Sequence, residues 1–226
     1  ISTVIAVPSR AMTQIVAPIT AKFMVENKMD ELNDLYKKTA ITLQVIGGFI
    51  MLGILTNIHQ VYALLPEKYS GGVAVVFLIS FSKFFDLMLG NNNSIIFNSK
   101  YYRTVLLLGL CLVVLTVSLN MYFIPNFGIE GAAIATLISI GLYSIAKFLF
   151  VVFKMDLFPF SKKTIVSLGI IALTFIVFYF WNFSFHPILN ILLKSVLITL
   201  FYWVLNYKCK TSDDINGVIK GFFAKF

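Results

Sequence analysis

Charged residues, cysteines, histidines and prolines are all scarce in this chain. Only 12% of its 226 residues are Asp, Glu, Lys or Arg, and it holds 2 Cys, 2 His and 6 Pro. Cys111 lies within an apolar run and Cys209 within a lysine-flanked tail, which excludes a disulfide framework and gives no metal-binding spacing. We therefore expect neither a metal site nor a cofactor.

Apolar residues take the place of the missing charge. Hydrophobic residues make up 59% of the chain, against roughly 45–50% in soluble proteins. Long runs carry the excess, such as Thr104–Ile124 and Thr164–Trp181. Because a bilayer core of about 30 Å needs about 20 apolar helical residues, the composition predicts an all-α integral membrane protein.

Seven apolar segments follow one another along the chain. Their approximate limits are Ile1–Ala21, Thr39–Leu65, Val73–Phe97, Thr104–Ile124, Gly131–Phe153, Thr164–Asn182 and Ile188–Tyr207. The chain opens inside an apolar run, without a start methionine or a signal-peptide pattern. We therefore expect further protein before Ile1, and about seven transmembrane helices after it.

The net charge of +8 is unevenly distributed among the links. Alternate links and the tail hold Lys22, Lys28, Lys37, Lys38, Lys100, Arg103, Lys154, Lys162, Lys163, Lys208, Lys210, Lys220 and Lys225, whereas the opposite links hold only Lys68. The positive-inside rule then places the tail in the cytoplasm and predicts a multi-pass protein whose first segment runs inward. Membrane topology thus accounts for the positive charge, and no nucleic-acid partner is needed to explain it. Attraction to anionic membrane lipids is a second consequence.

The links suggest how the chain divides. Residues 22–38 mix charges with apolar side chains, which fits either a helix on the membrane surface or a solvated connector. A basic, proline-containing link follows the fifth segment. We expect a five-span body (1–153), an appended two-helix hairpin (154–207) and a basic tail (208–226).

Arg10 lies inside the first segment, between Pro8 and Pro18. A charge at the centre of a membrane helix costs about 2.5–3.5 kcal/mol on insertion scales, so it needs a partner or a cavity. Prolines break helices where a cavity or a neighbouring helix accommodates them. Arg10, with Gln14 one turn on, fits an anion-binding face, and an internal carboxylate or carbonyl partner is the alternative.

Lys83 and Asp86 are three residues apart, hence on one helix face. We expect them to neutralise each other. The alternative is a polar lining that continues to Asn91, in which Asp86 holds a coupling proton or sodium ion. Lys147, near the inner end of its segment, is expected to snorkel, and Lys194 to snorkel or to pair.

The stretch "NMYFIPNFGIEGAAIAT" (Asn120–Thr136) contains two glycines around an acid. A phosphate-binding loop would need a preceding strand, and here an apolar helix precedes. We expect Pro125 to end that helix and Gly128 to turn the chain on the outer face. Small residues then recur at helical spacing, at Gly131, Ala132 and Ala135, which favours close helix packing in lipid.

The same stretch closely resembles a signature of polysaccharide flippases of the multidrug/oligosaccharidyl-lipid/polysaccharide exporter superfamily. Three further pieces agree in order: "ISTVIAVPSRAMTQIVAPITA", "LLPEKYSGG" and "LGNNNSIIFNSKYYR". The resemblance covers nearly the whole chain and is weakest in the tail. It implies a two-lobed transporter of about fourteen helices, of which this chain resembles the C-terminal lobe with its terminal hairpin. The missing N-terminal half would be its partner.

Such a resemblance implies transport and no enzymatic activity. These proteins flip undecaprenyl-diphosphate-linked oligosaccharides across the bacterial inner membrane for cell-surface polysaccharides such as O-antigen, alternating access to a cationic cavity. On that basis Arg10, Lys83, Gln14 and Asn91 are the candidate substrate-binding residues, and Asp86 is the candidate coupling-ion residue.

Two other functions stay open. A multidrug or organic-cation antiporter of the same superfamily would need acidic residues in its cavity, and Asp86 is the one acid deep in a segment. A membrane-embedded glycan polymerase or ligase would need sizeable outer loops, whereas Pro66–Gly72, Pro125–Glu130 and Phe183–Pro187 are short.

Overall fold

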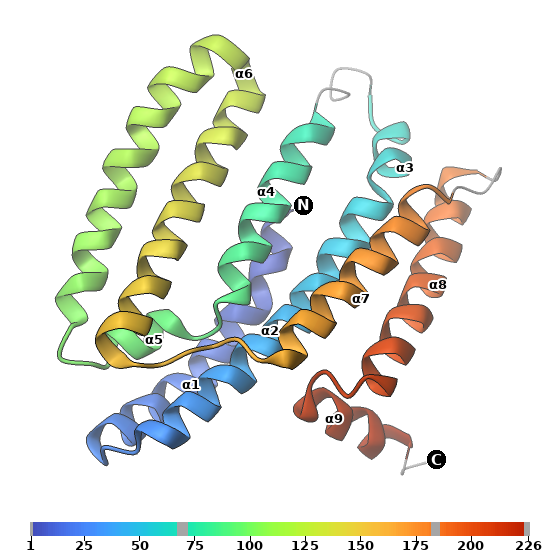
Figure 1. Ribbon diagram of the computed structural model, residues 1–226. Coiled ribbons are helices and arrows are strands. Elements are labelled where there is room, and N and C mark those ends of the chain that lie inside the picture. The colour runs from blue at the N-terminus through green and yellow to red at the C-terminus, as the bar shows by residue number, and fades with distance from the viewer. Residues whose placement is uncertain (1, 67–71, 182–185, 224–226) are drawn as a thin grey trace.

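A computed structural model describes residues 2–66, 72–181 and 186–223 (Figure 1). The described ranges are helical throughout, joined by turns and short links, and contain no strand. The elements are η1 (Ser2–Ala6), α1 (Val7–Val25), α2 (Met29–Thr56), α3 (Ile58–Ala63), α4 (Val73–Met88), α5 (Asn92–Phe97), α6 (Tyr102–Met155), α7 (Lys162–Tyr179), α8 (Pro187–Lys208) and α9 (Asp213–Phe223).

Five helices of the described chain are long and apolar enough to cross a membrane. They are η1 with α1 (Ser2–Val25), α2, α6, α7 and α8. The predicted all-α membrane class is therefore supported by the length and composition of the helices. With 16 residues, α4 is shorter than a helix that spans a bilayer unaided.

The 54-residue α6 folds back on itself at Gly128 (Figure 1). Gly128 has φ 57° and ψ −133°, a conformation that is essentially restricted to glycine. The predicted turn is there, but Pro125 does not end the helix: the first arm continues past it, and the chain reverses three residues later. Pro125 has no N–H, so one hydrogen bond of the first arm is missing just before the reversal.

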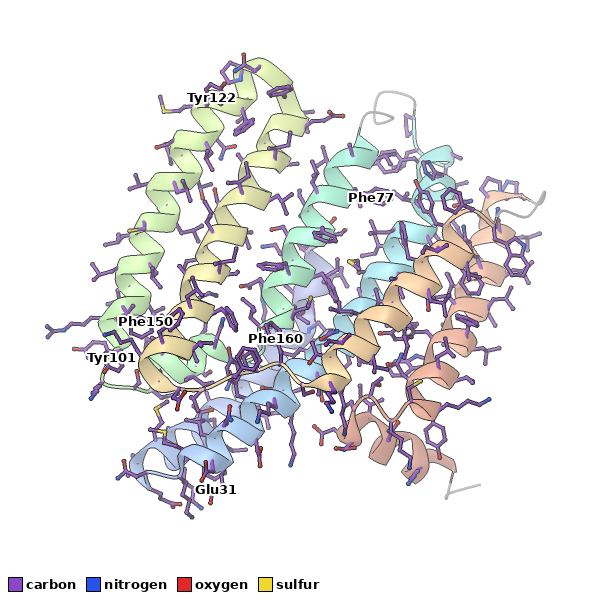
Figure 2. The ribbon with its side chains drawn as sticks, in the orientation of Figure 1. Glu31, Phe77, Tyr101, Tyr122, Phe150 and Phe160 are labelled. Atoms are coloured by element: carbon purple, nitrogen blue, oxygen red, sulfur yellow. The ribbon has the colours of Figure 1, made fainter. Side chains whose placement is uncertain are left out.

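Small residues bring the two arms of α6 together near the reversal. A Cβ atom at Gly131 would collide with the carbonyl oxygen of Phe123 on the first arm. Ala135 is fully buried and Ala132 half-buried. At the other end of the hairpin, the Tyr101 and Phe150 rings pack edge to face with centroids 5.4 Å apart (Figure 2).

The helix α2 is the centre of the fold, with α1, α4, α7 and α8 packed around it (Figure 1). Its Leu43 and Leu52 share one apolar core with Ile171 of α7 and Tyr202 of α8. The Tyr202 hydroxyl donates a hydrogen bond of 2.8 Å to the Val45 carbonyl. The terminal hairpin (154–207) is thus packed directly on the preceding helices.

Two predicted segments differ from the helices observed. The segment Val73–Phe97 is interrupted after Met88, and α5 starts at Asn92; Gly90 between them has φ 64° and lies against the Ala40 backbone. Residues 22–38 are mostly the first turns of α2, whose Leu32 and Tyr36 are buried in a second apolar cluster. This part of the link is therefore helical and continuous with α2, with an apolar face buried and charges such as Glu31 exposed.

Candidate functional site

The solvent-exposed side of helix α1 carries the first two predicted site residues. Arg10 and Gln14 are both exposed, whereas Val16 and Thr20 on the same helix are buried. Pro18 lies inside the helix. One face of α1 therefore packs against its neighbours and the other presents an arginine and an amide.

Arg10 has no hydrogen-bond or ion-pair partner among the residues that the structure describes. It lies about 13 Å along the helix from Ser2 and about 22 Å from Val25, by the rise per residue of helical chains. If this helix crosses a membrane, a lone guanidinium at that depth must face water, a ligand or further protein, because lipid does not solvate it.

Asp86 of α4 forms the most deeply enclosed charge contact, and its partners are on α6. Its Oδ1 accepts hydrogen bonds from Ser144 Oγ at 2.6 Å and from Lys147 Nζ at 3.2 Å. The Lys147 ammonium also lies 4.2 Å from the centre of the Tyr143 ring. The side chain of Lys147 is 1% exposed and that of Asp86 is 40% exposed.

Two predictions are wrong at this contact. Asp86 pairs with Lys147, not with Lys83, because its carboxylate is directed toward the buried face of α6 and away from its neighbour one turn back. Lys147 does not snorkel, since the packing of α6 on α4 encloses its whole side chain. The spacing of residues along α4 could not predict the Asp86–Lys147 pair, because its two residues lie on different helices.

Lys83 is half-buried and forms no ion pair within the described ranges. One turn earlier on α4, Ser80 Oγ donates to Ser2 Oγ at 3.2 Å, which fixes η1 against α4. Lys83 and Arg10 thus come from neighbouring elements, but no contact between their side chains is present in the described structure.

Asn91 lies apart from the Arg10 face. Its side chain is 5% exposed and donates a 3.1 Å hydrogen bond to Thr20 Oγ1. The bond joins the corner between α4 and α5 to the buried side of α1. In this conformation Asn91 holds helices together, and it does not line the face that carries Gln14.

Lys194 of α8 is also buried, and its Nζ donates a 2.7 Å hydrogen bond to the Thr56 carbonyl. Thr56 is the last residue of α2, where helix carbonyls lack intrahelical partners and a cation is favoured. Lys194 therefore caps a neighbouring helix. Across the described residues, no group of three or more His, Cys, Asp or Glu is placed to hold a metal ion.

These features define an all-α protein with helices of membrane-spanning length, one of which exposes an arginine and also contains an internal proline. Comparisons with protein-family models, with curated proteins and with solved structures gave no match.

Proposed function

We propose that this chain belongs to a bacterial inner-membrane flippase that moves undecaprenyl-diphosphate-linked oligosaccharides to the outer leaflet. The observation that carries the proposal is the exposed, unpaired Arg10 within a membrane-spanning helix. The diphosphate of such a substrate is an anion that a guanidinium binds bidentately. The resemblance of four ordered sequence pieces to polysaccharide flippases supports the same function.

The proposed binding surface is the exposed face of α1, and the cavity lies between it and the preceding half of the transporter. Gln14 adds a hydrogen-bonding group one turn from Arg10. Lys83 forms no ion pair within the described residues, and it contributes a second positive charge from α4, which packs against η1 at the start of the same helix. A substrate with two phosphates suits two separated cations better than a single one.

The Asp86–Lys147 contact argues against an organic-cation antiporter. Asp86 is the only acid in the described part of α4, and Lys147 offsets its charge at 3.2 Å. Because the Lys147 ammonium already offsets the Asp86 charge, the partly exposed carboxylate offers an organic cation little net negative charge. The proposed substrate is accordingly an anion, and the chain acts without chemical catalysis.

Arg10→Ala in the full-length protein tests the proposal. In cells that lack the native copy, we expect glycan export to fall about 10–100-fold, because a charge-assisted hydrogen-bonded contact is worth roughly 1.5–3 kcal/mol. Arg10→Lys should retain part of the activity. Arg103→Ala, which removes an exposed arginine from the first turn of α6, is the matched control and should export normally.

Membrane levels of each variant are measured in parallel by immunoblot. Normal export by well-inserted Arg10→Ala would remove Arg10 from the binding site. Drug accumulation that depends on the protein, with no change in glycan export, would favour the antiporter instead.

A further inference from the structure

The last helix of the described chain, α9, lies across the end of α8 (Figure 1). Hydrogen bonds in the turn between the two helices fix its direction. Lys210 adopts a left-handed conformation with φ 49°, and its N–H bonds to the Tyr207 carbonyl at 3.2 Å. Thr211 follows, with N–H bonding to the Asn206 carbonyl and Oγ1 donating to Asn206 Oδ1 at 2.7 Å. Such a helix cap fixes the direction in which the next helix leaves.

The start of α9 is hydrogen-bonded to α2 and α7. Ser212 Oγ and Thr42 Oγ1 share a hydrogen bond of 3.0 Å, and Ile215 enters the main apolar core. Lys163 of α7 donates to both carboxylate oxygens of Asp213, at 2.8 and 2.9 Å. These hydrogen bonds lower the pKa of Asp213 and offset its charge.

A hollow of about 490 Å³ lies between the end of α8 and α9. Lys208, Lys210 and Lys220 line it together with Tyr207, Asn216, Gly217 and Asp213, and the carboxylate of Asp213 is already bonded to Lys163. All three lysines are exposed, and within the part of the chain that the structure describes none of them forms an ion pair. The hollow thus concentrates three uncompensated positive charges.

The length of α8 puts these charges at the level of lipid headgroups. Its 22 residues extend about 33 Å, close to the roughly 30 Å thickness of a bilayer core. Pro187 and Lys208 therefore lie near the two membrane surfaces. Tyr207 fits the same depth, because tyrosine favours the membrane–water interface.

An exposed apolar ridge leads along α8 to the hollow. Leu192, Val196, Leu200 and Val204 follow one another at four-residue steps and are each at least half exposed. Lys208 is the next residue in the same row. Residues four apart form a continuous ridge on a helix, so a lipid acyl chain lying along it would bring its headgroup to Lys208.

We propose that the hollow between α8 and α9 binds the phosphate headgroup of an anionic membrane phospholipid, with an acyl chain along the α8 ridge. The three ammonium groups supply the charge, and Asn216 and Tyr207 supply hydrogen-bonding groups. Bound there, the lipid would join α9 to the membrane surface. The site is separate from Arg10 and does not depend on the proposed transport.

The test uses the full chain purified in a neutral detergent. Binding of dioleoylphosphatidylglycerol is measured by native mass spectrometry and by the shift in thermal unfolding, with dioleoylphosphatidylcholine as the zwitterionic comparison. We expect phosphatidylglycerol to bind at least tenfold more tightly and to raise the unfolding temperature.

The variant Lys208→Gln/Lys210→Gln/Lys220→Gln should lose this preference, with binding about 100-fold weaker, since each lysine near an anionic surface contributes roughly a fivefold factor. The control Lys22→Gln/Lys100→Gln/Lys162→Gln removes the same charge from the end of α1, the turn before α6 and the start of α7, and should bind as the parent does. Retained preference in the first variant, or equal loss in both, would overturn the proposed site.

Glycerol phosphate, a headgroup without acyl chains, separates a lipid site from a phosphate site. We expect it to compete only at concentrations far above those of the lipid. If it bound as tightly as phosphatidylglycerol, the ridge would have no role and the proposal of a lipid ligand would fail.

Discussion

The pair Lys147–Asp86 is asymmetric, because the lysine side chain is enclosed while the aspartate side chain is 40% exposed. A buried ammonium that loses its carboxylate keeps only the contact with the Tyr143 ring, whereas a partly exposed carboxylate that loses its ammonium is still solvated by water. The hydrogen bond from Ser144 would still support the carboxylate. Substitution of Asp86 should therefore lower the free energy of unfolding more than substitution of Lys147.

Asp86→Asn should lower the free energy of unfolding by about 2–3 kcal/mol, because it leaves Lys147 buried without a counter-charge. Lys147→Met, which keeps the side-chain volume, should cost less than half as much. The double variant should recover most of the loss, since it leaves no buried charge. Unfolding of the purified chain by a denaturing detergent measures all three. A larger loss for Lys147→Met than for Asp86→Asn would show that the asymmetry is not the governing effect.

At the scale of the helices, the reversal of α6 depends on how closely its two arms approach. The carbonyl of Phe123 occupies the space that a side chain at Gly131 would need. The obstacle is backbone, which cannot move aside as a flexible side chain can. Gly141, one and a half turns beyond Ala135 in the same arm, has nothing within 4 Å of its added Cβ position.

Gly131→Ala should therefore destabilise the hairpin by about 1–3 kcal/mol through overpacking. Gly141→Ala is the matched control and should be neutral or stabilising by up to about 1 kcal/mol, because alanine is the better helix former. Thermal unfolding in one detergent compares the two. Equal unfolding temperatures for the two variants would contradict the close approach of the arms.

The long helices, such as α7 and α8, could be predicted because a long apolar run alone indicates them. The turn of α6 could be predicted because a glycine closely follows a proline there. The break between α4 and α5 could not be predicted, since one apolar run covers both helices and Gly90 gives only a weak signal. The Lys147–Asp86 contact joins residues 61 positions apart, and only helix packing decides such a pair. The exposure of Arg10 likewise depends on which face of α1 packs against its neighbours.

For the whole molecule, the basic links share one end of the helical bundle. The turn between α1 and α2, the link from α5 to α6, the link from α6 to α7, and α9 lie together there, while α3 and the reversal of α6 lie at the opposite end (Figure 1). Lysines and arginines are frequent in the first group of segments. The positive-inside rule predicts that this end faces the cytoplasm.

The two native cysteines test this orientation. Cys209 is exposed at the basic end, and Cys111 is exposed on the first arm of α6, inside a membrane-spanning helix. In intact cells we expect a membrane-impermeant maleimide to label neither: Cys209 because it faces the cytoplasm, Cys111 because lipid covers it. Permeabilisation should expose Cys209 alone.

A cysteine at the opposite end completes the experiment. Phe127→Cys, placed beside the reversal at Gly128 in a Cys209→Ser background, should react in intact cells, because Phe127 is 55% exposed at the end that the positive-inside rule places outside. Labelling is quantified by the mass shift of the modified protein, and equal insertion of the variants is verified by total protein. If Cys209 reacted in intact cells while Phe127→Cys required permeabilisation, the orientation would be inverted. The α9 lysines would then lie at the outer leaflet instead of the cytoplasmic one.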